Sequence, residues 1–139
     1  MKKVDARILT MVLLAACAHT VTLAPAATPD IDIWKAAASG NLEAIKQHLK
    51  AGTDVDVKDT PGGSTPFLIA AAFGQVEAAK FLIEKGANVN APSNDGATAL
   101  HGAAFFCRTE IVKLLLSKGA VVDAKNNRGE TPIDSVAGE

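Results

Sequence analysis

The chain has 139 residues, enough for one modest domain. Hydrophobic residues make up 48 % of it but aromatic residues only 4 %, so small and aliphatic side chains must build most of the core, which favours closely packed helices. The formal net charge of −1 gives no electrostatic reason to expect a nucleic acid partner. The two cysteines and three histidines lack the close pairing that a zinc site needs, so we predict no metal and no cofactor.

The first segment has the pattern of an export signal. Three basic residues precede an apolar run over residues 8–18, which is shorter than the roughly 20 apolar residues that span a bilayer. A basic start, a short apolar middle and an exit of small residues are typical of a secretory signal peptide. The small residues at 24–26 predict a signal peptide over residues 1–26, a linker over 27–30 and a protein exported to a bacterial periplasm or cell envelope.

A second cleavage site competes with the first. The tetrapeptide Leu14-Ala15-Ala16-Cys17 resembles a bacterial lipobox, in which the signal would cover residues 1–16 and Cys17 would carry a lipid. The protein would then attach to a membrane through that lipid alone. Both outcomes stay open on the sequence.

The remaining segment, residues 31–139, is built from a repeated unit. The glycines that begin successive units follow one another at intervals of 33 residues: Gly63, Gly96 and Gly129. The upstream segment fits the same unit with one additional residue near 62–63. The spacing predicts three full repeats and a partial one, at about 31–62, 63–95, 96–128 and 129–139.

Each unit has the signals of two helices and a polar turn. A threonine that can cap a helix precedes the first helix, at Thr65, Thr98 and Thr131. That helix ends at a turn glycine, Gly40 or Gly74, and a second helix follows with apolar residues at helical spacing. After it, a turn-rich segment such as Asn94-Asp95-Gly96 forms a polar finger. Because one unit cannot cover its apolar faces alone, the units must stack into a solenoid.

This unit resembles the ankyrin repeat. The resemblance rests on the T-P/A-x-L/H start, the alanine pair after it, the glycine between the helices and the E-x-x-K-x-L-L-x-x-G-A-x-V-N/D ending, in register over about residues 31–137. It implies an all-α solenoid of helix-turn-helix repeats with short β-turn fingers. It also implies recognition of another protein, with no chemistry of its own.

His101 and Cys107 are the residues that most suggest an active site. One hypothesis is a thiol-dependent hydrolase in which His101 activates Cys107. The alternative is structural: His101 is the helix-start histidine of the resemblance, and Cys107 stands where the other units have Gly40 and Gly74. Cys107 would then have a positive φ, with a strain of about 1 kcal/mol. We expect His48, on a second helix, to be solvated.

The candidate binding site consists of aromatic residues rimmed by finger tips. Phe105 and Phe106 fall at the variable positions that end a first helix, on the concave side, where the preceding unit has Ala72 and Phe73. Exposed aromatic residues in a groove are what a partner buries. The alternative for any one of these rings is that it packs against a neighbouring repeat and the fingers. The finger residues predicted to join them are Ser93, Asn94, Asp95, Asn127 and Arg128.

The leading hypothesis is therefore an exported monomer that binds a protein and is not an enzyme. The hydrolase is one alternative. The other is a purely structural envelope lipoprotein anchored at Cys17.

Overall fold

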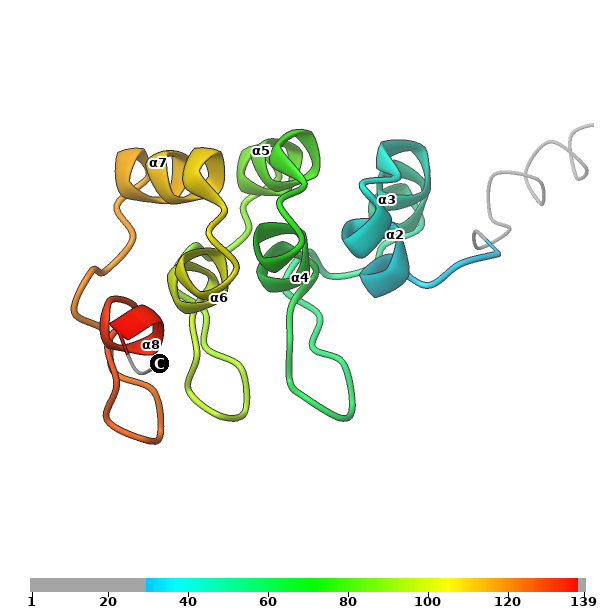
Figure 1. Ribbon diagram of the computed structural model, residues 1–139. Coiled ribbons are helices and arrows are strands. Elements are labelled where there is room, and N and C mark those ends of the chain that lie inside the picture. Colours follow the sequence, from blue (N-terminus) through cyan, green and yellow to red (C-terminus); the bar gives the residue numbers. More distant parts are fainter. Residues whose placement is uncertain (1–29, 138–139) are drawn as a thin grey trace, which may run out of the picture.

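The computed structural model describes residues 30–137, which fold into a row of helical hairpins (Figure 1). No strand occurs within this range. The predicted signal peptide, the Cys17 lipidation site and all but the last residue of the predicted linker lie outside the described residues. The helices are α2 (Ile33–Ser39), α3 (Leu42–Lys50), α4 (Pro66–Ala72), α5 (Val76–Glu84), α6 (Ala99–Phe105), α7 (Thr109–Ser117) and α8 (Asp134–Ala137).

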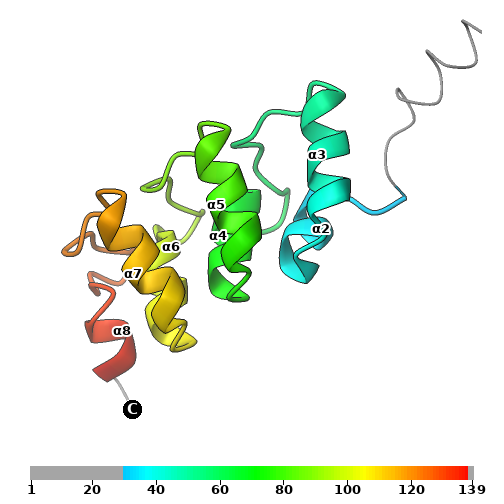
Figure 2. The ribbon, with the colours of Figure 1, turned by 90° about the horizontal axis from the view of Figure 1, so that it is seen from above.

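The helices form two layers. Helices α2, α4, α6 and α8 make an inner layer next to the fingers, and α3, α5 and α7 make an outer layer (Figure 1). Each inner helix contacts the inner helix of the next repeat, and the outer helices contact one another in the same order. The view from above shows the hairpins side by side along the row (Figure 2). This arrangement confirms the predicted solenoid of three helix-turn-helix repeats, and α8 belongs to the partial one.

Alanine forms the contact between successive inner helices. The equivalent residues Ala36, Ala70 and Ala103 are all fully buried, and Ala37 and Ala71 are buried beside them. A methyl side chain lets helix backbones approach closely, as the low aromatic content suggests. Larger side chains fill the space between the layers: Phe67, Ile45, Leu82, Ile111 and Leu115.

The inner helices start at side-chain caps. Asp32 accepts a hydrogen bond from the Lys35 amide at 2.7 Å, and Thr65 accepts one from the Leu68 amide at 3.2 Å. Pro66 is the first residue of α4, where a missing amide hydrogen leaves no helical bond unmade. In the partial repeat, Thr131 accepts a bond from the Asp134 amide at 3.3 Å. The capping roles expected of Thr65 and Thr131 are thus observed.

The expectation that His48 is solvated is wrong. Its side chain is only 9 % exposed, and its Nε2 lies 2.8 Å from the carbonyl oxygen of Ile31. The position is equivalent to Leu82 and Leu115, which are fully buried, because the outer helix turns this residue toward the inner layer. In the first repeat, the imidazole of His48 occupies the position of these leucines, and its hydrogen bond to Ile31 holds the segment that precedes α2.

The two helices of a repeat are joined by a residue in the left-handed region. Gly40 and Gly74 have φ values of 72° and 73°, and Cys107 has a φ of 54° at the equivalent place. Cys107 is the one non-glycine residue with positive φ in the described part of the chain. A β-carbon is unfavourable there, by about 1 kcal/mol or more. The predicted conformation of Cys107 is therefore observed.

The substitution Cys107→Gly should raise the thermal stability. Relief of about 1 kcal/mol of strain corresponds to roughly 4–8 °C in Tm for a domain of this size, less the larger chain entropy that glycine has when unfolded. The measurement is thermal unfolding followed by circular dichroism.

The matched control is Gly74→Cys, which introduces the same side chain at the equivalent turn. It should lower Tm, because φ is 73° and a β-carbon there would lie 2.9 Å from Cδ of Arg108. A clear fall in Tm for Cys107→Gly would contradict the assignment of Cys107 as a replaced turn glycine.

Candidate functional site

The fingers are three tight hairpin turns held side by side. Each closes on itself by a backbone hydrogen bond, as from the Ser93 amide to the Ala97 carbonyl at 2.9 Å. Neighbouring fingers are joined by the Asn94 amide donating to Gly62 at 2.9 Å and by the Asn127 amide donating to Asp95 at 2.8 Å. These bonds fix the position of each finger relative to the next, so the side chains between fingers and helices have a defined placement.

Two of the predicted finger residues take part in this stacking. The side-chain amide of Asn127 donates to the backbone carbonyl of Asn94 at 3.0 Å. The Asn94 side chain lies against Gly63, where an added β-carbon would overlap it. Stacking therefore accounts for part of the polar character of the finger tips.

The three phenylalanines predicted to form the site are all exposed. Phe73 is 57 % exposed, Phe105 55 % and Phe106 53 %. Phe105 is the last residue of α6, and Phe73 and Phe106 immediately follow α4 and α6. The rings of Phe105 and Phe106 pack edge to face, with centroids 5.0 Å apart. Because these positions follow the last buried turn of each inner helix, packing of the repeats leaves their side chains in solvent.

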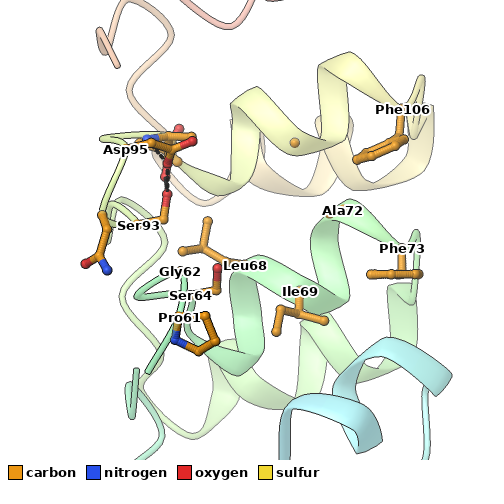
Figure 3. A pocket seen from close by; sticks show the side chains of 14 residues that line it. Pro61, Gly62, Ser64, Leu68, Ile69, Ala72, Phe73, Ser93, Asp95 and Phe106 are labelled. Atoms are coloured by element: carbon orange, nitrogen blue, oxygen red, sulfur yellow. Dashed lines mark hydrogen bonds between the residues drawn. The ribbon is translucent and has the colours of Figure 1, made fainter. Parts of the chain in front are cut away.

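A groove of about 530 Å³ runs between α4, α6 and the first two fingers; we call it the α4–α6 groove (Figure 3). Phe73 and Phe106 lie at one end of it and Ser93 and Asp95 at the other (Figure 3). The groove brings together six of the nine predicted binding residues: Ala72, Phe73, Ser93, Asn94, Asp95 and Phe106. The other residues that line it are Pro61, Gly62, Ser64, Leu68, Ile69, Ala97, Thr98 and Gly102.

A second, smaller groove of about 280 Å³ lies between α6 and α8, the α6–α8 groove. Phe105 and Arg128 line it, together with Phe106, which is shared with the first groove. The guanidinium of Arg128 pairs with Glu130, with 3.3 Å between Nε and Oε2. Asn127 lines neither groove. The predicted residues are thus divided between two adjacent grooves.

Gly102 contributes to the site and is absent from the sequence-based prediction. It is the one glycine inside any of the described helices. The equivalent residue of the preceding repeat is Ile69, so α6 lacks a side chain where α4 has one. An added β-carbon at Gly102 would lie 3.3 Å from Cβ of Ala72. A glycine within a helix, with a large residue at the same place one repeat earlier, is the sequence signal that could have identified this close approach of α6 to α4.

Asp95 supplies the charge of the α4–α6 groove. The Ser93 hydroxyl donates to Oδ1, and the Ala97 amide donates to the same oxygen at 3.2 Å. The bond from Ser93, followed by the one from Ala97, holds the pKa of Asp95 below its usual value, so the carboxylate is ionised at neutral pH. No ion pair forms at Asp95 within residues 30–137, and no other charged residue lines the groove.

His101 is engaged by structural hydrogen bonds. It is 3 % exposed, with Nδ1 3.1 Å from the Thr98 amide and Nε2 2.9 Å from the Glu130 carbonyl oxygen. The Thr98 amide donates to Nδ1, so the ring proton resides on Nε2 and is donated to Glu130. His101 thus caps α6 and ties it to the partial repeat, and neither nitrogen is available for proton transfer.

Cys107 is exposed and follows the opposite end of α6 from His101. In the part of the chain that the structure describes, no hydrogen bond joins the two residues. The described residues also contain no group of three metal-ligating side chains, and no helix among them is long and apolar enough to span a membrane. Among the described residues, His101 is therefore not positioned as a base for the Cys107 thiol.

The substitution His101→Leu should destabilise the fold, even though Leu68 occupies the equivalent place. Leucine preserves the apolar contacts but leaves the Thr98 amide unpaired, at a cost of about 1–3 kcal/mol. It also removes the bond to the Glu130 carbonyl, which keeps its bond from the Asn126 amide. His101→Gln, which retains an acceptor for the Thr98 amide, should lose less. Urea unfolding measures both variants. A His101→Leu protein as stable as the parent would contradict the bridging role.

Comparison with known proteins agrees with this architecture. The family model for ankyrin repeats (3 copies) matches residues 33–126, more than half of the chain. Human DNA-binding protein RFXANK is 34 % identical over 82 residues, which are 59 % of this chain and 32 % of that protein. Human protein phosphatase 1 regulatory subunit 27 is 40 % identical over 64 residues, 46 % of this chain and 41 % of that one.

A third relative is the phosphocholine transferase AnkX of Legionella pneumophila, 31 % identical over 62 residues, or 45 % of this chain and 6 % of AnkX. The chain thus spans less than half the length of each of these relatives. The matched region coincides with the stacked helical hairpins and their fingers. The chain therefore belongs to the ankyrin-repeat family.

Proposed function

We propose that this protein is an exported, non-catalytic module that binds another protein through the α4–α6 groove, the α6–α8 groove and its finger tips. Ankyrin repeats imply protein–protein interaction. The observation that carries the more specific proposal is the set of half-exposed phenylalanines, Phe73, Phe105 and Phe106, at the end of two adjacent grooves.

These three rings would gain free energy if a partner protein removed them from water. Full burial of one phenylalanine side chain contributes about 1.5–3 kcal/mol. Each of the three has roughly half of its surface still to bury. Large aromatic residues near the centre of an interface tend to dominate its affinity. A partner that covers both grooves would bury all three.

The absence of catalysis is part of the proposal. His101 has both ring nitrogens in structural hydrogen bonds, which argues against a thiol-dependent hydrolase. AnkX is named as a transferase, but the match covers only 6 % of it, so that name gives no argument for an enzyme here. Protein phosphatase 1 regulatory subunit 27 is named as a regulatory protein, which agrees with a binding role.

The proposed partner is a protein and not a nucleic acid. The name DNA-binding protein belongs to RFXANK, to which this chain is similar over part of its length. Phosphate recognition needs a concentration of positive charge. Here the net charge is −1, the α4–α6 groove carries Asp95, and Arg128 in the neighbouring groove is neutralised by Glu130. Without its partner we expect the protein to be a monomer.

Export rests on the amino-terminal sequence pattern. If residues 1–26 are a cleaved signal peptide, mass spectrometry of the envelope fraction should find a chain that begins at Ala27. If the lipobox is used, the chain should begin at Cys17, incorporate labelled palmitate, and lose the label in Cys17→Ala. A cellular protein that retains Met1 would overturn the export proposal.

Replacing Phe73, Phe105 and Phe106 together by alanine should abolish capture of the partner from envelope extract. Loss of three aromatic anchors, at about 1 kcal/mol or more each, predicts a fall in affinity of at least a hundredfold. The measurement is cross-linking followed by mass spectrometry, which identifies both the partner and the face that it contacts. The fold should be unaffected, because all three side chains are exposed.

The matched control replaces three exposed apolar residues outside the grooves by alanine: Leu116, Val121 and Val122. It should capture the partner as the parent does. Equal capture by the phenylalanine variant and the parent would show that the site is elsewhere.

A further inference from the structure

The α4–α6 groove has two chemically different ends. At one end are the rings of Phe73 and Phe106, and at the other is the carboxylate of Asp95, with Leu68 and Ile69 between them (Figure 3). The apolar residues come from α4 and from the ends of α4 and α6, and the carboxylate comes from a finger, so stacking of the second and third repeats sets their spacing. A ligand that lies along the groove meets both ends.

The middle of the groove has an apolar floor where α6 approaches α4 closely. A β-carbon added at Gly102 would lie 3.3 Å from Cβ of Ala72, so a small residue on each helix permits this approach. Leu68 and Ile69 of α4 line the groove beside them. An apolar side chain from outside that packs on this floor would gain dispersion contacts with it.

The polar end of the groove is preorganised for a cation. Ser93 and Ala97 both bond to Oδ1 of Asp95, which fixes the carboxylate and favours its ionised form. No cation of the described chain pairs with it, and it is the sole charged residue of the groove. An acidic ligand would be repelled at this position, whereas a lysine or arginine would gain a charge-assisted hydrogen bond.

We infer that the α4–α6 groove binds a short segment of the partner protein in which an apolar side chain and a lysine or arginine lie close together. The apolar side chain packs between Phe73 and Phe106 over Ala72, and the basic group bonds to Asp95. This inference rests on the proposed function and specifies the chemistry of the segment recognised.

The test is selection of a phage-displayed library of random 12-residue peptides against the full chain. Enriched peptides should combine a large apolar residue with a lysine or arginine. Synthetic copies should bind in fluorescence anisotropy, lose about tenfold or more in affinity with Phe106→Ala, and lose about two- to fivefold with Asp95→Asn. Asparagine keeps the acceptor for Ser93 and Ala97, so this variant removes charge without opening the finger.

The matched controls are Val122→Ala and Asp123→Asn, which change an exposed apolar residue and an exposed carboxylate outside both grooves. Both should leave the affinity unchanged. Peptides without a basic residue, peptides insensitive to Asp95→Asn, or a failure to enrich any peptide would overturn the inference.

The proposed function and the inferred chemistry of the bound segment are tested by different experiments. If the triple alanine variant loses the envelope partner while the peptide test fails, the protein-binding role stands and the assigned chemistry of the segment is wrong. If the triple variant retains the partner, the proposed site itself is wrong.

Discussion

The close approach of successive inner helices is the contact on which the rest of this structure depends. It is made by alanines that recur at equivalent positions, Ala36, Ala70 and Ala103, all without solvent exposure. A larger residue there would push two repeats apart and shift every finger that follows. The grooves exist only at this spacing, because their walls belong to different repeats and no single repeat contains one.

Two sets of polar contacts, one on each side of these buried alanines, keep neighbouring repeats in register. On the finger side, backbone amides of one finger donate to carbonyls of the finger before it. On the other side, Gln75 donates to the Ala38 carbonyl at 2.8 Å, and its equivalent Arg108 donates to the Ala72 carbonyl at 3.0 Å. These side chains reach back over the turn residues Gly40 and Gly74, where a β-carbon would meet them. The turn glycines are thus required by the neighbouring repeat as well as by their own φ values.

The repeat spacing predicted the fold because each repeat obeys the same local rules: a cap, two short amphipathic helices, a left-handed turn and a polar finger. The same alignment predicted the conformation of Cys107 and the exposure of the phenylalanines. The prediction for His48 was wrong because it relied on the polar side chain. The equivalent positions in the next two repeats, Leu82 and Leu115, are buried, and they give the correct expectation. The α4–α6 groove was not predictable as a cavity, because its walls belong to two repeats and its size depends on the distance between them. Asn127 has a structural role that the sequence did not indicate, since this residue, predicted to bind, also holds one finger against the next.

The residues at the ends of the inner helices are not needed for packing of the repeats, so they can vary without changing the fold. A residue there lies past the last buried turn. Neither the contact between the buried alanines nor the hydrogen bonds between fingers therefore limits which amino acid can occupy the position. The first repeat has Ser39 at this place, exposed and bonded to its own helix, and that repeat has the same pair of helices. Phenylalanine at the two following equivalents, Phe73 and Phe106, therefore adds exposed apolar surface that the fold itself does not use. Phe106 lines both grooves, so a ligand that packs on its ring in one groove also changes the wall of the other. The two grooves therefore form one continuous surface, which the proposed partner would contact as a unit.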